Sequence, residues 1–135
     1  MVTKSIKLWT ILPCTPDEIF SSWLDSRKHG DMIGADAKIE AEEGGKFSMW
    51  SDSISGVTLS IDSSKHRIVQ QWRSEYDDWP MDKPSKLIVE FLPYKNDQTK
   101  VRLWQSEIPY NHAKDIELGW KNYYWKPIKE YFANK

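Results

Sequence analysis

The C-terminal stretch 111–135 constrains the fold most, because it is the only long segment with strong helical periodicity. Large apolar side chains recur in it at steps of three and four residues, so they share one stripe of a helix. The stripe consists of Ile116, Trp120, Tyr123, Tyr124, Pro127, Ile128 and Tyr131. A helix of this kind is stable when another element covers its apolar stripe, so the rest of the chain must supply that surface.

The segments before this helix supply a sheet. Apolar and polar residues alternate with a period of two, which predicts strands, and Gly-rich or polar turns such as 43–46 separate them. The predicted strands cover residues 4–12, 37–42, 47–50, 57–62, 66–75, 85–94 and 99–108. Short connections between consecutive strands indicate an antiparallel sheet, and the C-terminal helix is expected to cover one of its faces.

Two short helices are predicted between the first two strands. Thr15 and Glu18 are spaced as a capping box around Pro16, which predicts a helix of about two turns. Residues 27–34 form a second short helix or a turn that ends at Gly34. The fold class is therefore α+β, with a curved antiparallel sheet, two short helices and one long C-terminal helix across the concave face. A chain of 135 residues is expected to form a single domain over residues 1–135.

An ordered set of short motifs along nearly the whole chain resembles a known family. The motifs are Gly44-Gly45-Lys46-Phe47, Ile54-Ser55-Gly56-Val57, Ile68-Val69-Gln70-Gln71-Trp72-Arg73 with Trp79-Pro80, Thr99-Lys100-Val101-Arg102-Leu103 with Gln105 and Ile108-Pro109, and Gly119-Trp120 with Tyr123-Tyr124, Ile128-Lys129 and Phe132. In these motifs the chain resembles the START-like (SRPBCC) helix-grip domains, and within them the activator of heat-shock-protein-90 ATPase homologue family. Ser64 departs from the proline usual at its position, which affects only a turn.

The resemblance implies a cavity-bearing helix-grip domain. Eukaryotic members of the family carry a further N-terminal domain that contributes to chaperone binding, and a chain of 135 residues has no room for one. Gly119 costs roughly 1 kcal/mol relative to alanine inside a helix. We interpret it as a close-packing point at the cavity roof. Pro127 lacks an N–H and crowds the preceding turn, so we expect the helix to kink there.

Eight tryptophans fit either a large apolar core or an aromatic-lined cavity for an apolar ligand. In the second interpretation, strand parity and the helical stripe select the candidate lining residues Trp23, Val57, Leu59, Gln70, Trp72, Val89, Phe91, Leu103, Gln105, Glu107, Trp120 and Tyr124. Gln105 and Glu107 follow Leu103 on one face of the last strand. They are either solvated at the strand's end or polar groups at the cavity mouth.

Composition and motif spacing exclude several classes of function. The net charge of −1 with scattered basic residues gives no reason to expect nucleic acid or an anionic membrane as partner. No leader-like or membrane-spanning apolar run is present, so a cytoplasmic location is expected. Cys14 is alone and the histidines lack metal-ligand spacing, which argues against a metal site. No phosphate-binding glycine loop occurs, and no cofactor is expected.

Three functional hypotheses follow. The first is a non-enzymatic, stress-related domain that binds a small apolar ligand between the sheet and the helix. The second is a co-chaperone-like protein that binds a heat-shock chaperone through its surface. The third is an enzyme, cyclase-like or hydrolase-like as in parts of the wider superfamily, that uses Glu107 as a buried general acid. No second catalytic group accompanies Glu107, so no catalytic residue is assigned.

Overall fold

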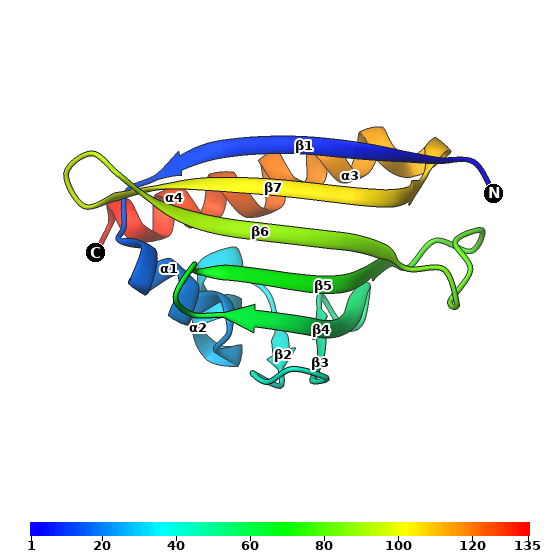
Figure 1. The fold of residues 1–135 in the computed structure, drawn as a ribbon, viewed down its shortest axis with the longest axis horizontal. Coiled ribbons are helices and arrows are strands. Elements are labelled where there is room, and N and C mark those ends of the chain that lie inside the picture. Colours follow the sequence, from blue (N-terminus) through cyan, green and yellow to red (C-terminus); the bar gives the residue numbers. More distant parts are fainter.

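The computed structural model describes residues 1–135, and its strands form one seven-stranded antiparallel sheet (Figure 1). The strand order across the sheet is β1-β7-β6-β5-β4-β3-β2. The strands are β1 (Thr3–Leu12), β2 (Ala37–Ile39), β3 (Lys46–Met49), β4 (Ile54–Asp62), β5 (Arg67–Ser74), β6 (Ser85–Tyr94) and β7 (Gln98–Pro109). Strands β2 to β7 each pair with the strand that follows or precedes them in the sequence. Strand β1 is the exception, because it pairs with β7 at the edge of the sheet opposite β2. The predicted antiparallel sheet is confirmed.

Two short helices follow β1, as predicted. Helix α1 (Pro16–Trp23) begins with the predicted capping box, in which the Glu18 N–H donates to Thr15 Oγ1 over 3.2 Å and the Thr15 N–H donates to Glu18 Oε1 over 3.1 Å. Helix α2 (Ser26–Ile33) is capped by Asp25 and ends at Gly34, whose φ of 69° is left-handed. None of the helices combines the length and the apolar character that a transmembrane helix requires.

The C-terminal helical stretch lies along one face of the sheet, behind β1, β7 and β6 in Figure 1. A 3-10 turn (Tyr110–His112) leads into α3 (Ala113–Gly119), a π-helical segment (Trp120–Trp125) and α4 (Lys126–Ala133). The irregularity expected at Pro127 therefore takes the form of a π turn directly before it. The Lys126 N–H donates to the Lys121 carbonyl five residues back, and Pro127 has no N–H to continue an α-helical ladder.

Trp120 joins this helix to the core through its ring and its nitrogen. Its ring stacks on Trp23 at 6.2 Å and lies 5.8 Å from Trp72, with an interplanar angle of 33°. Trp120 Nε1 donates to Gln105 Oε1 over 2.8 Å, and Gln105 Nε2 donates to Ser85 Oγ over 2.9 Å. A buried indole N–H and a buried amide are thereby both satisfied. Gln105 is a fully enclosed link between helix and sheet.

Two β-bulges make the predicted side-chain directions wrong at three positions. In β4 the register shifts between Thr58 and Ser60, so Gly56 and Thr58 face the core while Val57 lies on the opposite, convex face and Leu59 is 44% exposed. In β7 a second irregularity surrounds Glu107, whose φ is +63° and whose side chain is exposed. An extra residue in one strand reverses the alternation, which a period of two read from sequence does not register.

His29 ties α2 to the C-terminal helical stretch from inside the core. Its Nδ1 bonds the Trp23 carbonyl oxygen over 2.8 Å, and its Nε2 bonds Tyr124 Oη over 2.9 Å. The side chain is buried, and this desolvation lowers the pKa of His29 to about 4 despite the hydrogen bond to Trp23. The imidazole is therefore neutral in the folded protein at neutral pH.

Replacing Gly56 with alanine should destabilise the sheet. An added Cβ would overlap the Gln71 carbonyl oxygen and lie 2.7 Å from Phe47 Cζ, so strand or ring must shift. We expect a loss of about 1–3 kcal/mol in the free energy of unfolding, measured by urea denaturation. The neighbouring Ser55→Ala is the control and should change stability by less than about 0.5 kcal/mol. Equal stability of the two variants would contradict the close approach at Gly56.

Stability should fall in mild acid because of His29. Between pH 6.5 and pH 4 the unfolded chain binds a proton at His29 that the folded chain does not, so the free energy of unfolding decreases as the pH falls. We expect His29 to contribute a loss of roughly 2 kcal/mol between pH 7 and pH 5. Urea denaturation at both values should show this loss in the wild type, and His29→Gln should lack it. The same pH dependence in both proteins would rule out a buried neutral histidine.

Candidate functional site

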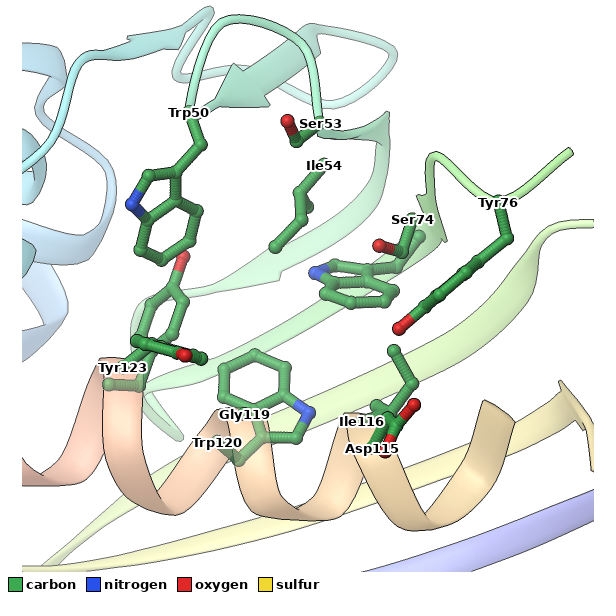
Figure 2. A pocket seen from close by; sticks show the side chains of 12 residues that line it. Trp50, Ser53, Ile54, Ser74, Tyr76, Asp115, Ile116, Gly119, Trp120 and Tyr123 are labelled. Carbon is green, nitrogen blue, oxygen red and sulfur yellow. The ribbon is translucent and has the colours of Figure 1, made fainter. Parts of the chain in front are cut away.

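An open pocket of about 400 Å³, with a mainly hydrophobic lining, lies between the C-terminal helical stretch, the start of β4 and the end of β5. Figure 2 shows Trp50 and Tyr123 on one side, Tyr76 and Asp115 on the other, and Trp120 between them on the helix. Eight of the twelve lining residues are hydrophobic. The lining consists of Trp50, Ser53, Ile54, Trp72, Ser74, Tyr76, Asp115, Ile116, Gly119, Trp120, Tyr123 and Tyr124.

Gly119 keeps this pocket open and is not the close-packing point that the sequence predicted. A Cβ built at Gly119 would meet only Tyr123 Cδ2, at 3.9 Å, which is ordinary van der Waals contact. The helix therefore does not need glycine for contact with a strand. What the missing side chain provides is space on the pocket wall, the other role that a mid-helix glycine can have.

A small void lies deeper, behind the pocket. Its volume is about 10 Å³, at most enough for a single water molecule. Trp72, Trp120 and Tyr124 line both spaces, so these three rings form the partition between them. Tyr124 is fixed in this partition by its bond to His29, and burial raises its pKa well above the ordinary value for tyrosine. The space beneath the helix is thus filled by side chains, and only its open end is hollow.

The rim of the pocket is held by a polar cluster from the loop after β5 and the start of the helical stretch. The Tyr76 ring stacks on the His112 ring, with centroids 3.7 Å apart. His112 Nε2 bonds Asp78 Oδ1 over 2.6 Å, and Asn111 Nδ2 donates to Asp78 Oδ2 over 2.9 Å, so the pKa of Asp78 is lowered. Burial and the Asp115 charge raise the pKa of Tyr76, which keeps its hydroxyl protonated at neutral pH. The loop is therefore pinned to the helical stretch.

The predicted lining residues separate into distinct groups. Trp72, Trp120 and Tyr124 line the open pocket, and Trp23 and Gln70 join them around the small void. Four others are enclosed in the core away from the pocket, namely Val89, Phe91, Leu103 and Gln105. The remaining three do not face the interior, because the bulges in β4 and β7 reverse the side-chain alternation there. They are Val57, Leu59 and Glu107.

Most residues that line the pocket were not predicted from the sequence. Trp50, Ser53 and Ile54 lie in and after the turn between β3 and β4, and Ser74 and Tyr76 lie where β5 ends. These positions come together only through the curvature of the sheet, which strand periodicity does not report. Gly119 was the available signal, since an unexplained glycine inside an aromatic helical stripe indicates vacant space.

Catalytic groups are sparse in this region. Glu107, the carboxylate considered as a general acid, is exposed and does not line the pocket, so the hypothesis of a cavity glutamate is wrong. Burial, together with the Glu18 charge, raises the pKa of Cys14 to about 12, so its thiolate is not available near neutral pH. No three His, Cys, Asp or Glu side chains come together as metal ligands.

Comparisons with known proteins agree with this architecture. The family model described as activator of Hsp90 ATPase homolog 1-like protein matches residues 13–133. An activator of 90 kDa heat shock protein ATPase homolog from Dictyostelium discoideum is 32% identical over 97% of this chain and 33% of its own length. The human activator of 90 kDa heat shock protein ATPase homolog 1 is 29% identical over 97% of this chain and 38% of its own length. The chain thus spans about a third of these curated relatives.

A solved structure supports the same assignment. The crystal structure of an HSP90 activator from Plasmodium falciparum superimposes with a TM-score of 0.83 and 25% identity, covering 96% of each chain. The helix-grip fold implied by the motifs is therefore confirmed, as is the family resemblance. The chain belongs to the family of activator of Hsp90 ATPase homologues.

Proposed function

We propose that this chain is a non-enzymatic binding domain that takes a small, largely apolar ligand in the open pocket. The observation that carries the proposal is a hollow of about 400 Å³ with a mainly hydrophobic lining. This volume lies within the range of small-molecule sites, which are typically apolar with a few polar groups that orient the ligand. Ser53, Ser74 and Tyr76 supply such polar groups here.

The proposed ligand enters at the open end of the fold and stops at the ring partition. Trp120 is held by the stacked ring of Trp23, by the tilted ring of Trp72 and by its hydrogen bond to Gln105, so its place in the partition is fixed. Trp72 also lines the pocket, and its Nε1 is buried without a hydrogen-bond partner. A buried donor of this kind costs free energy until an acceptor reaches it.

Filling the pocket from Gly119 should weaken ligand binding without unfolding the chain. Gly119→Leu introduces a side chain into the open space, and leucine favours a helix more than glycine does. With Nile red as a neutral apolar probe, we expect wild-type fluorescence to saturate and Gly119→Leu to bind at least roughly 10-fold more weakly. Gly119→Ala is the matched control, expected to retain most binding and gain about 0.5–1 kcal/mol of stability. Undiminished binding by Gly119→Leu would place the probe elsewhere.

A second candidate function is regulation of a heat-shock chaperone, and family membership together with the convex face of the sheet favours it. Outward positions of β1, β5, β6 and β7 carry six cations, Lys7, Arg67, Arg73, Lys86, Lys100 and Arg102, with Glu90 as the only acidic residue facing outward in these regular ladders. Two tryptophans lie among them. Lys100 Nζ lies 4.8 Å from the Trp9 ring centroid, and Arg102 Cζ lies 4.7 Å from that of Trp104.

The chemistry of this convex face fits an acidic protein surface. Tryptophan and arginine are the residue types that contribute most often to interface energy, and clustered cations speed association with an acidic partner. Trp9 is 64% exposed, so one aromatic anchor is already accessible. We propose an acidic region of a heat-shock-protein-90-type chaperone as the partner. Such a partner accords with the predicted cytoplasmic location.

Reversing the charge of the convex face should weaken the proposed stimulation of the chaperone's ATPase. Lys100→Glu combined with Arg102→Glu is expected to raise the concentration needed to stimulate chaperone ATPase by about 10-fold, because attraction becomes repulsion. The readout is phosphate release by purified heat-shock protein 90 titrated with each variant. Lys114→Glu combined with Lys129→Glu makes the same charge change on the helical stretch and should stimulate like the wild type. Equal loss in both pairs, or no stimulation by the wild type, would count against the proposed surface.

A further inference from the structure

The lining of the open pocket is unusually rich in aromatic rings. Six of its twelve residues are aromatic and come from three separate parts of the chain: Trp50, Trp72, Tyr76, Trp120, Tyr123 and Tyr124. The face of an aromatic ring carries partial negative charge, so several rings around one space attract a cation that is poorly hydrated. In Figure 2 Trp50, Trp120 and Tyr123 approach the pocket from different directions. A site for a neutral apolar ligand does not need so many aromatic rings, because aliphatic side chains also provide an apolar lining.

Asp115 is the only charged residue in this lining. None of the ion pairs in the chain involves it, since these join His66 to Asp17, Arg67 to Glu90, His112 to Asp78 and Lys121 to Glu117. No side-chain hydrogen bond satisfies its carboxylate either. The Asp115 charge nevertheless acts on the pocket wall, because it contributes to the raised pKa of Tyr76. The carboxylate is thus free to balance a charge carried by a bound molecule.

We propose that the pocket binds a ligand with a positively charged, alkyl-substituted ammonium group on an apolar body, held by the aromatic rings and by Asp115. This inference rests on the proposed ligand-binding function and narrows its ligand class. Methyl groups around the nitrogen spread the charge and weaken hydration, so a tertiary or quaternary ammonium loses less on entering the pocket than a primary one. A carboxylate-bearing ligand is disfavoured because it meets the Asp115 charge with no cation in the lining.

The test compares two probes of nearly equal shape, benzyltrimethylammonium and neopentylbenzene, which differ in a charged nitrogen against a neutral carbon. Calorimetric titration, or competition with Nile red, gives the affinity of each for the intact chain. We expect the cation to bind about 10-fold tighter than its neutral isostere. Asp115→Asn should reduce that ratio by about 3-fold, a modest change because Asp115 is exposed and water screens its charge. Tyr123→Leu, at a position 65% exposed and therefore tolerant of substitution, should also reduce the ratio while preserving neopentylbenzene binding.

A matched control removes one negative charge from the same helix outside the pocket. Glu117 pairs with Lys121 and does not line the cavity, so Glu117→Gln should leave the affinity ratio unchanged. A short peptide bearing trimethyllysine tests the source of the ammonium group. Weaker binding than benzyltrimethylammonium supports a small-molecule ligand, and tighter binding would overturn it in favour of a protein side chain.

These measurements distinguish failure of the ammonium inference from failure of the more general ligand-binding proposal. If both probes bind with equal affinity, or the neutral one binds tighter, the ammonium inference is overturned while ligand binding stands. If Nile red binds but neither probe displaces it, the ammonium inference alone is overturned, and if Nile red and both probes all fail to bind, both proposals fail together. If the ratio is the same in the wild type, Asp115→Asn and Tyr123→Leu, the selectivity does not come from these residues and the inference is overturned.

Discussion

The contact between Trp120 and the sheet is the interaction on which the rest of the structure depends. A lone amphipathic helix and a half-buried sheet each expose apolar surface, and each is stable only against the other. Trp120 provides both parts of that contact, with its ring between Trp23 and Trp72 and its N–H on Gln105. Because the indole donor is satisfied inside the core, the ring has one position and one orientation. The helix is thereby fixed along its length as well as across the sheet.

The tight packing around Trp120 also determines where a cavity can form. The rings of Trp72, Trp120 and Tyr124 fill the space beneath the helix and leave only a void of about 10 Å³. The sheet curves away from the helix at the ends of β4 and β5, and there the side chains no longer meet. Gly119 extends that gap because it has no side chain to fill it. The open pocket therefore ends against the rings of Trp72, Trp120 and Tyr124.

The architecture could be predicted from sequence because its signals are local. Alternation along β6, the capping box at Thr15 and the stripe of the C-terminal helix each reflect neighbours within a few residues. The candidate site could not be predicted to the same extent. One bulge in β4 turned Leu59 outward, another turned Glu107 out, and the pocket residues of the β3–β4 turn meet the helix only through sheet curvature. Each error concerns a direction or a distance set by tertiary structure, which periodicity cannot encode.

The two surfaces for which functions are proposed lie on opposite sides of the sheet, and this separation has a physical consequence. The pocket opens beside the helix, on the side of the buried residues, whereas Trp9, Lys100 and Arg102 project from the convex side. A partner on the convex face therefore touches no pocket residue directly. Binding at one surface affects the other only if it changes the sheet between them, and the partition of Trp72 and Trp120 is the part of that sheet-helix interface nearest the ligand. Trp72 belongs to β5 and Trp120 to the helical stretch, so at these two rings the sheet meets the wall of the pocket.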